Sequence, residues 1–392
     1  MTDSQSDFER LTGPDRRPFL PRPGGLGALI IVIGVAIMVA LVILWPRDTP
    51  DLDVGVIGFA GETVRSEVGV AIPGPCSYAA DAECIVVEFL VVEEGSESHG
   101  QTPEIEFSTD PGQPRLERGD QVFLSVVELD DGTVSFQYAD RDRQPLLVAL
   151  TLLFAVAVVG LGRLRGVAAL AGLAVSVAIL IFFILPAIVQ GRDAVLVAVA
   201  GGGAIALVSL YLAHGYNPLT HVAALGAFSA LLLTIGLSAL VVAFADFTGL
   251  VNEESFYLLS IPTLELNGLL LAGLVLGAIG ALDDVTVTQA SAVWEVHNAN
   301  PALGPEALYA AGIRVGRDHI VSTVNTLLLA YAGASLPLLI LFTLSNQDLG
   351  VVASSEVVAV EIARTLVGSI GLVAAVPITT WLGSRVAVRR GD

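Results

Sequence analysis

The chain has no lysine and carries little charge of either sign. Its 19 basic residues are all arginines, acidic residues outnumber them at 39, and charged residues make up only 15% of the 392 positions. A net charge of −20 without an extended basic segment argues against a nucleic acid as partner. With 54% hydrophobic residues, the composition lies outside the range of soluble globular domains. It predicts an integral membrane protein, whose first partner is the lipid bilayer.

Signatures of enzymes are missing as well. The sequence has no GxSxG nucleophile motif, no HExxH metal-binding motif and no GxxxxGK phosphate-binding loop. These motifs are typical of hydrolases, metalloproteases and ATP-driven proteins. We therefore expect that the chain is not an enzyme and holds no cofactor and no metal.

Eight apolar stretches are about 20 residues long, which is enough to cross a hydrocarbon core of about 30 Å as a helix. The expected fold class is thus a polytopic α-helical membrane protein with about eight transmembrane helices. The first stretch has the length of a retained anchor and lacks a small-residue cleavage site. The predicted spans cover residues 25–45, 145–162, 167–189, 194–213, 219–245, 267–288, 320–344 and 364–384.

Arginines gather in the segments that would lie on one side of the membrane. The positive-inside rule assigns this side to the cytoplasm, so both termini are predicted to be cytoplasmic. A tail of residues 1–24 precedes the anchor 25–45, and a tail of residues 385–392 follows a seven-helix membrane domain, 145–384. The arginines on this side are Arg10, Arg16, Arg17, Arg22, Arg163, Arg165, Arg314, Arg317, Arg385, Arg389 and Arg390.

The one long polar region, residues 46–144, falls outside the cytoplasm between the first and second spans. Gly, Pro and Asp clusters separate its short β-type runs. This pattern predicts a small β-rich domain, either a barrel or a sandwich, with an OB-like fold as the first expectation. It holds 21 of the 39 acidic residues and six arginines. Such acidity indicates either a cation-attracting surface or a solvated domain kept monomeric by its charge. The runs cover residues 54–59, 84–92, 103–107, 121–129 and 133–138.

The only two cysteines, Cys76 and Cys84, both lie in this predicted extracytoplasmic domain. That side of the membrane is oxidising, so a disulfide that closes a short loop is the favoured state. Two thiols are too few for a structural zinc site.

Two adjacent acids, Asp283 and Asp284, interrupt the sixth apolar stretch. In a continuous helix, Asp284 shares one face with Thr288, Ser291 and Glu295. If the acids lie near the middle of the bilayer, their carboxylates need a proton or a cation, which is the chemistry of coupled transport. If the helix leaves the membrane at Asp283, the same face meets the cytosol. The sequence leaves both interpretations open.

The seventh span carries a second polar face. His319 and Thr326 lie on it and Asn325 lies on its flank. Small and hydroxylated residues on one face also serve close helix packing, and His319 stands where a helix start would be capped. We consider these three side chains as polar partners of the acids, with packing as the alternative.

At these residues the chain resembles the YibE/F family of bacterial membrane proteins. The resemblance covers most of the chain from about residue 140 onward and is closest to the actinobacterial branch, in which an extracytoplasmic domain and the membrane region share one chain. It implies a multi-pass protein of the bacterial plasma membrane and is compatible with a transporter. It rests on 282-LDDVTVTQASAVWEVHNANP-301, 315-VGRDHIVSTVNTLLLAYAGASLPLLILF-342 and 361-EIARTLVGSIGLVAAVPITTWL-382, and more weakly on 213-AHGYNPLTHVAALGAF-228 and 140-DRDRQPLLVAL-150.

A weaker similarity is to the protein-export subunit SecF and its RND relatives. In these proteins an acidic residue in a membrane helix serves proton coupling, and a connecting segment leads on to a Thr-rich helix. Asp283 and Asp284 stand where that acid would be, before the segment 303–318 and the helix 321–329. The chain has eight predicted spans and a SecF-type unit has six, so this similarity is an analogy of arrangement.

Two hypotheses about function follow. In the first, the chain is a secondary transporter or export-associated protein of a small solute or ion, and Asp283 and Asp284 take up and release a proton or cation. In the second, it is a non-transporting membrane scaffold or sensor, whose outer domain binds an envelope protein and whose polar membrane residues hold helices together.

Overall fold

The structure is a computed structural model that describes residues 25–47, 62–77, 79–128, 132–344 and 347–389. These residues form two compact units. The helical unit contains 25–47, 171–251, 265–344 and 347–389, and the β-domain unit contains 62–77, 79–128, 132–170 and 252–264.

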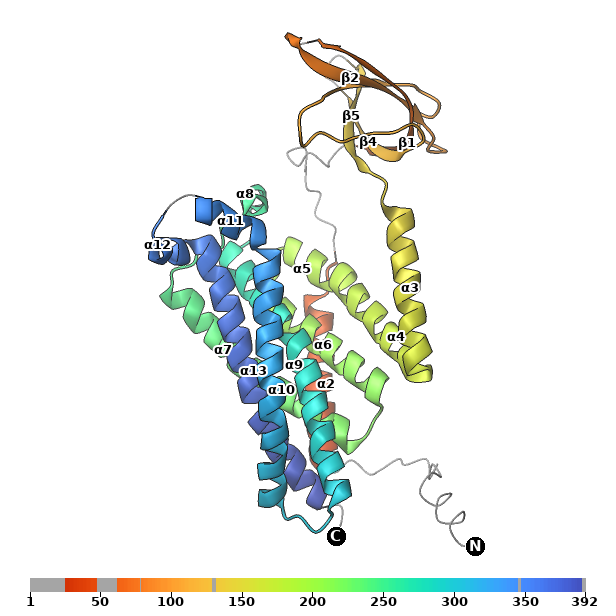
Figure 1. Cartoon of the computed structure of the whole chain (residues 1–392). Coiled ribbons are helices and arrows are strands. Elements are labelled where there is room, and N and C mark those ends of the chain that lie inside the picture. The colour runs from red at the N-terminus through yellow and green to blue at the C-terminus, as the bar shows by residue number, and fades with distance from the viewer. Residues whose placement is uncertain (1–24, 48–61, 78, 129–131, 345–346, 390–392) are drawn as a thin grey trace, which may run out of the picture. The chain divides into compact units, whose positions relative to one another are not determined.

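Long helices make up the helical unit. Helix α9 packs against α6, α7, α10 and α13, and α2 packs against α6 and α7 (Figure 1). Shorter helices α11 (Leu336–Leu344) and α12 (Leu349–Ser354) connect α10 to α13. The long helices are α2 (Gly25–Leu44), α6 (Ala194–His214), α7 (Pro218–Phe244), α9 (Leu266–Ala299), α10 (Pro305–Ala334) and α13 (Glu356–Val388).

The helix that precedes α6 crosses the boundary between the two units. It runs over 26 residues as α4 (Leu164–Ile179), a π-helical turn η1 (Leu180–Ile184) and α5 (Leu185–Val189). The π turn comes directly before Pro186. A proline has no N–H for the helix ladder, and the wider turn accommodates this gap.

Seven helices of the described chain are long and apolar enough to cross a membrane, and the pair α10 and α11, bent by 66°, makes up to eight. Seven to eight such helices agree with the prediction of about eight. Two of the helices are longer than the spans predicted within them, since α9 continues past residue 288 to Ala299 and α10 begins before residue 320, at Pro305. Apolar residues continue on the buried face of α9 after Asp284, so nothing breaks the helix before Asn300 and Pro301.

Several helices of the helical unit start or finish at one common end. There Ile30 of α2 packs with Leu210 of α6 and Val222 of α7, and Leu382 of α13 and Trp294 of α9 border the same cluster. This end carries the connections α6–α7 and α9–α10, and we call it the predicted cytoplasmic end. The arrangement matches the alternation of spans deduced from the arginines.

Helices α7 and α13 interlock through threonines and glycines. A Cβ atom on Gly226 of α7 would lie 2.1 Å from the hydroxyl of Thr379 of α13, and a Cβ atom on Gly371 of α13 would lie 2.2 Å from the hydroxyl of Thr234 of α7. Each helix thus places a threonine over a glycine of its antiparallel neighbour. Small residues allow this approach in a bilayer, where apolar burial does not drive helices together.

The β-domain unit contains one curved antiparallel sheet with the strand order β3-β2-β1-β4-β5. The rings of Phe107 on β3 and Tyr138 on β5 lie 5.6 Å apart, so the two edge strands approach each other and the sheet forms a half-barrel. Of the two predicted architectures, the barrel is therefore supported and the sandwich is not. The strands are β1 (Glu62–Cys76), β2 (Ala79–Val91), β3 (Glu104–Ser108), β4 (Gln121–Glu128) and β5 (Val134–Arg141).

The sequence did not predict β1, the strand that pairs with both β2 and β4. Its glycines and prolines are unusual in a central strand, and Gly69 lies at a register shift between Val68 and Ala71. Val64 and Val68 of β1 are nonetheless fully buried in the core with Phe89. The four other strands lie at predicted runs, while the run 54–59 lies outside the described residues.

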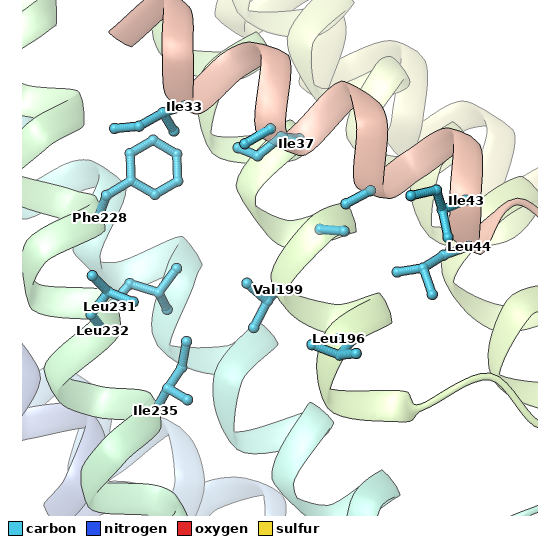
Figure 2. A pocket seen from close by; sticks show the side chains of 13 residues that line it. Ile33, Ile37, Ile43, Leu44, Leu196, Val199, Phe228, Leu231, Leu232 and Ile235 are labelled. Carbon is cyan, nitrogen blue, oxygen red and sulfur yellow. The ribbon is translucent and has the colours of Figure 1, made fainter. Parts of the chain in front are cut away.

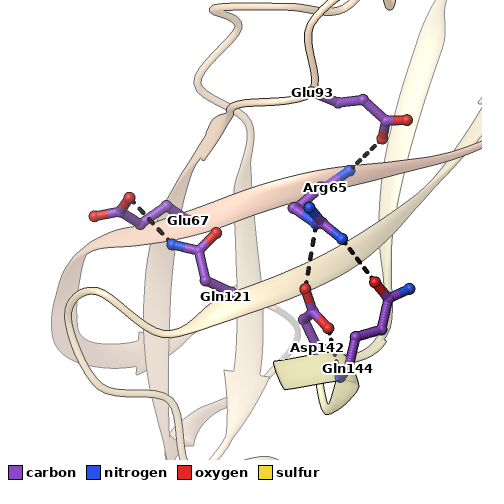
Figure 3. Close-up of polar contacts among 6 residues, drawn as sticks. All are labelled: Arg65, Glu67, Glu93, Gln121, Asp142 and Gln144. Atoms are coloured by element: carbon purple, nitrogen blue, oxygen red, sulfur yellow. Dashed lines mark hydrogen bonds and ion pairs between the residues drawn. The ribbon is translucent and has the colours of Figure 1, made fainter. Parts of the chain in front are cut away.

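Strand β5 leads directly into helix α3 (Gln144–Gly162), and an arginine fixes this junction (Figure 3). Arg65 of β1 forms an ion pair with Asp142 at 3.2 Å and donates a hydrogen bond to the side chain of Gln144 at 2.9 Å. The Asp142 side chain is almost fully buried and also accepts a hydrogen bond from the backbone N–H of Gln144. The start of α3 is thereby attached to the sheet. A short helix α8 (Glu253–Leu258) completes this unit.

The predicted disulfide is confirmed. Cys76 at the end of β1 and Cys84 in β2 are bonded across the β1–β2 hairpin. Both cysteines are almost completely buried. The bond closes a short loop at the end of the β1–β2 hairpin, where the Glu106 side chain also accepts a hydrogen bond from the backbone N–H of Ser77.

We expect that replacing Cys76 and Cys84 together by Ser lowers the stability of the half-barrel by about 2–3 kcal/mol, the chain-entropy value for a short loop. Hydrogen–deuterium exchange of the full chain should show faster exchange in β1 and β2. A reducing agent should have the same effect on the wild type and none on the double variant. Equal exchange in all samples would contradict a stabilising role.

We also expect Gly371→Ala to destabilise the helical unit by about 1–3 kcal/mol, because its Cβ atom would overlap the hydroxyl of Thr234. Adding Thr234→Ala should restore most of this loss, since the remaining Cβ atoms would be about in van der Waals contact. The matched control is Gly368→Ala in the same helix, where no atom lies within 4 Å of the new Cβ. Thermal unfolding in detergent measures all three, and an equal effect of both alanines would refute the interlock.

Candidate functional site

Helix α9 is longer than a membrane crossing requires. Its 34 residues span about 51 Å at 1.5 Å per residue, against a hydrocarbon core of about 30 Å. Asp283 and Asp284 occupy its middle, 17 and 18 positions after Leu266. Neither acid is at a helix end, where a carboxylate would meet water.

Asp283 turns toward helix α6 and is mostly covered there. Its Oδ2 atom accepts a hydrogen bond of 2.7 Å from the hydroxyl of Ser209. Its Oδ1 atom is buried and has no hydrogen-bond partner in the described part of the chain. Gly172 of α4 packs on the backbone of Ser209, with 3.6 Å from a Cβ placed on the glycine to the Cα of the serine. Helices α6 and α9 therefore meet at this carboxyl group, and α4 packs against the backbone of Ser209.

The position of Ser209 gives the depth of Asp283. Ser209 lies five residues before His214, the last residue of α6, which corresponds to about 7–8 Å along the axis. Asp283 thus lies inside the bundle, in the third that is nearest to the predicted cytoplasmic end. Both interpretations of the sequence, an acid near the middle of the bilayer and an acid at the cytosolic surface, stay predictions.

The charge balance at Asp283 is incomplete. The ion pairs among the described residues include neither Asp283 nor Asp284. One neutral hydroxyl donor does not compensate for moving a carboxylate out of water, and an ionised acid at this depth is costly. A proton or a cation at the buried, unpartnered Oδ1 atom would remove this cost.

The second acid differs from the first. Asp284 is exposed on the outer face of α9, together with Thr288 and Glu295, and Ser291 on the same face is half-buried. The opposite face of α9 is the one packed into the bundle, with Val285, Ala290 and Val293 among its buried residues. The predicted common face exists, but it turns away from the other helices.

The polar residues of α10 also lie apart from Asp283. Asn325 and Thr326 are exposed, and the Thr326 hydroxyl donates to the backbone carbonyl of Ser322 in its own helix. The Nε2 atom of His319 is buried without a hydrogen-bond partner in the described structure. Among the described residues, no hydrogen bond joins His319, Asn325 or Thr326 to either acid, and their role as partners stays a prediction.

Sequence reasoning missed the polar residue that joins three helices, Gln289. It is completely buried in α9, and its Nε2 atom donates to the carbonyl of Gly312 in α10 at 2.9 Å and to the hydroxyl of Thr380 in α13 at 2.7 Å. Gly312 and Gly316 make room for it, because a Cβ atom on Gly316 would lie 2.5 Å from its Oε1 atom. The sequence contained a signal for this contact. A polar glutamine stands within the apolar run after Asp284, and two glycines four residues apart follow in the next helix.

A second missed cluster lies at the predicted cytoplasmic end. The hydroxyl of Tyr211 lies 2.8 Å from Nδ1 of the buried His221, and the ring of Tyr216 packs edge-on against that histidine. This contact connects the end of α6 to the start of α7, two residues beyond Ser209. His221 is thus engaged with aromatic side chains.

The described residues contain one group of three side chains close enough to share a metal ion, Cys76, Cys84 and Glu106. Both of its cysteines form the disulfide, which leaves them without thiolates for a metal.

We expect that Gln289→Met, which keeps the length of the side chain, lowers the stability of the helical unit by about 1 kcal/mol, because the two interhelical hydrogen bonds are lost. Thr288→Ala on the exposed face of the same helix should change it by less than about 0.5 kcal/mol. Unfolding of both variants in detergent provides the comparison. Equal stability of the two would mean that the Gln289 junction does not hold the helices.

The site can be compared with known proteins. Residues 150–389 match the model of the family described as YibE/F-like protein. The match begins within α3 and ends just after α13, so it includes Asp283, Ser209 and Gln289 and leaves out the β half-barrel. No curated protein and no solved structure matches the chain. Because the family covers more than half of the 392 residues, the chain belongs to the YibE/F-like family.

Proposed function

We propose that this protein is a secondary transporter or export-associated membrane protein in which Asp283 couples the movement of a small solute or ion to a proton or cation. One observation carries the proposal. The carboxyl group of Asp283 lies within a bundle of apolar helices, with one oxygen bonded to Ser209 and the other buried and unpartnered. Acids in this situation serve ion and proton pathways.

The chemistry of the site supports reversible occupancy. In the protonated form, the Asp283 carboxyl group is neutral and tolerates its apolar surroundings. In the ionised form, it needs a cation or water at Oδ1, so the two forms favour different packing of α4, α6 and α9. A proton or a cation can shift this equilibrium only if it binds one packing more tightly than the other. Because Oδ1 of Asp283 is buried and unpartnered, a change in the packing around it would change that affinity.

The predicted roles of the two aspartates are no longer equal in this proposal. Asp283 is the coupling group, and Asp284 faces the exterior of the chain. The acidic half-barrel, on the extracytoplasmic side by the arginine rule, would receive or release the transported species.

The scaffold hypothesis keeps one observation in its favour. Four polar side chains are exposed on the antiparallel helices α9 and α10, namely Asp284, Thr288, Asn325 and Thr326. They lie along the helix axes between two contacts that join these helices. The contacts are Gly277 with Tyr331 and Gln289 with Gly312. Polar side chains that face lipid are costly. Contact with a helix of another protein would cover them and would make assembly the function of this face.

The test is charge movement across reconstituted protein on a solid-supported membrane after a pH jump. We expect a transient current in the wild type that is lost in Asp283→Asn, because the amide keeps the size and the hydrogen bond with Ser209 but cannot bind a proton. Asp284→Asn is the matched control and should keep most of the current. Ser209→Ala should change the pH at which half of the current is reached.

Two outcomes would reject the coupling role. A full current in a folded Asp283→Asn protein would show that the acid is not on the pathway. The absence of current in the wild type, combined with a complex that Asp284→Asn and Asn325→Leu disrupt, would favour the scaffold hypothesis.

A further inference from the structure

An apolar pocket of about 490 Å³ lies between α2, α6 and α7, away from Asp283 (Figure 2). Ile33, Ile37 and Leu44 of α2 form one wall, and the others come from α6 and α7. No lining side chain is polar. The remaining lining residues are Ala36, Ala40, Ile43, Leu196, Val199, Ala200, Phe228, Leu231, Leu232 and Ile235.

The pocket lies beside the contacts that α2 makes with α6 and α7. Near the predicted cytoplasmic end, Ile30 is buried against Leu210 and Val222. From Ile33 to Leu44 one side of α2 lines the pocket, and Ile43 and Leu232 at its border are exposed. The outer face of α2 is apolar too, with Val35 and other valines exposed. The pocket is therefore continuous with a surface suited to the hydrocarbon of a bilayer.

The dimensions fit one lipid chain. From Ile33 to Leu44 the lining extends over 11 residues, or about 16 Å of helix, which is close to half of a hydrocarbon core of about 30 Å. A pocket of one leaflet's depth that is lined only by apolar side chains suits one acyl chain.

Two arginines lie close along the chain to the helix ends that line the outer part of the pocket. Arg47 follows Leu44 by three residues, and its backbone N–H donates to the side chain of Gln190 at 3.3 Å. Arg192 comes two residues after Gln190. Both arginines are exposed and form no ion pair within the described chain. The neighbouring Asp193 caps helix α6 by accepting from the N–H of Leu196.

We infer that this pocket binds one acyl chain of an anionic membrane glycerophospholipid, whose phosphate group lies at Arg47 and Arg192. The arginines provide charge complementarity for a phosphate, for which guanidinium groups are well suited. The apolar lining accepts the chain, and the open side toward Ile43 lets it enter laterally from the bilayer. The bound lipid would add contacts between α2 and the α6 and α7 helices along the pocket.

The test is native mass spectrometry of the full-length protein after reconstitution in vesicles with equal amounts of phosphatidylglycerol and phosphatidylcholine. We expect the wild type to retain one phospholipid per chain, with phosphatidylglycerol preferred at least threefold. Ala40→Trp fills the pocket and should lower retention at least fivefold. Val39→Trp, an equal change on the exposed face of the same helix, is the matched control and should leave retention unchanged.

A second pair of changes separates the head group from the chain. Arg47→Gln combined with Arg192→Gln should remove the preference for phosphatidylglycerol while one lipid is still retained. Size-exclusion chromatography and thermal unfolding show whether each variant is folded, and Val199→Phe replaces Ala40→Trp as the filling variant if that protein is not.

Three results would overturn the inference. The first is equal retention in the filling variant and in Val39→Trp. The second is a wild type that loses all lipid under conditions in which the folded protein survives. The third is a lipid-free dimer that Ala40→Trp converts to monomer, which would assign the pocket to a helix of a second copy.

Discussion

The close approach of α7, α9 and α13 is the constraint on which the membrane region depends. In a bilayer these helices gain little by burying apolar surface, so contact must come from tight packing and from polar groups that find partners. Glycines provide the space, threonines fill it, and Gln289 bonds to two neighbouring helices at once. The polar side chains among them would be costly if they faced lipid. This cost favours the single arrangement in which all of them are covered.

This packing also creates the surroundings of Asp283. Helix α9 is held from one side by α13 and α10, so its other side is pressed against α6, where Ser209 is the only hydrogen-bond donor found for the acid among the described residues. A rigid junction at Gln289 and an incompletely satisfied carboxyl group at Asp283 thus lie less than two turns apart on one helix. In the proposed function, the junction at Gln289 holds α9 in place, so that a proton or cation at Asp283 would act on the packing of the neighbouring helices.

The two units differ in what stabilises them. The half-barrel has an apolar core around Phe89 and Leu124, a disulfide and a polar junction through Arg65, which are means by which a small domain is stabilised. The helical unit has neither disulfide nor extensive ion pairing in its described part. It depends instead on the close approach of its helices and on buried polar side chains such as Gln289.

The sequence by itself determined the long apolar helices, the disulfide, four of the five strands and the family, because hydrophobic length, cysteine position and strand alternation are local properties. It also indicated Asp283 and Asp284 together as the residues of interest. It could not show that Asp283 and Asp284 face opposite environments, because a period of 3.6 residues gives relative directions and no reference to the bundle. Only the tertiary structure decided this, since the direction of each face depends on where Ser209, 74 residues earlier in the chain, and Gly312 come to lie.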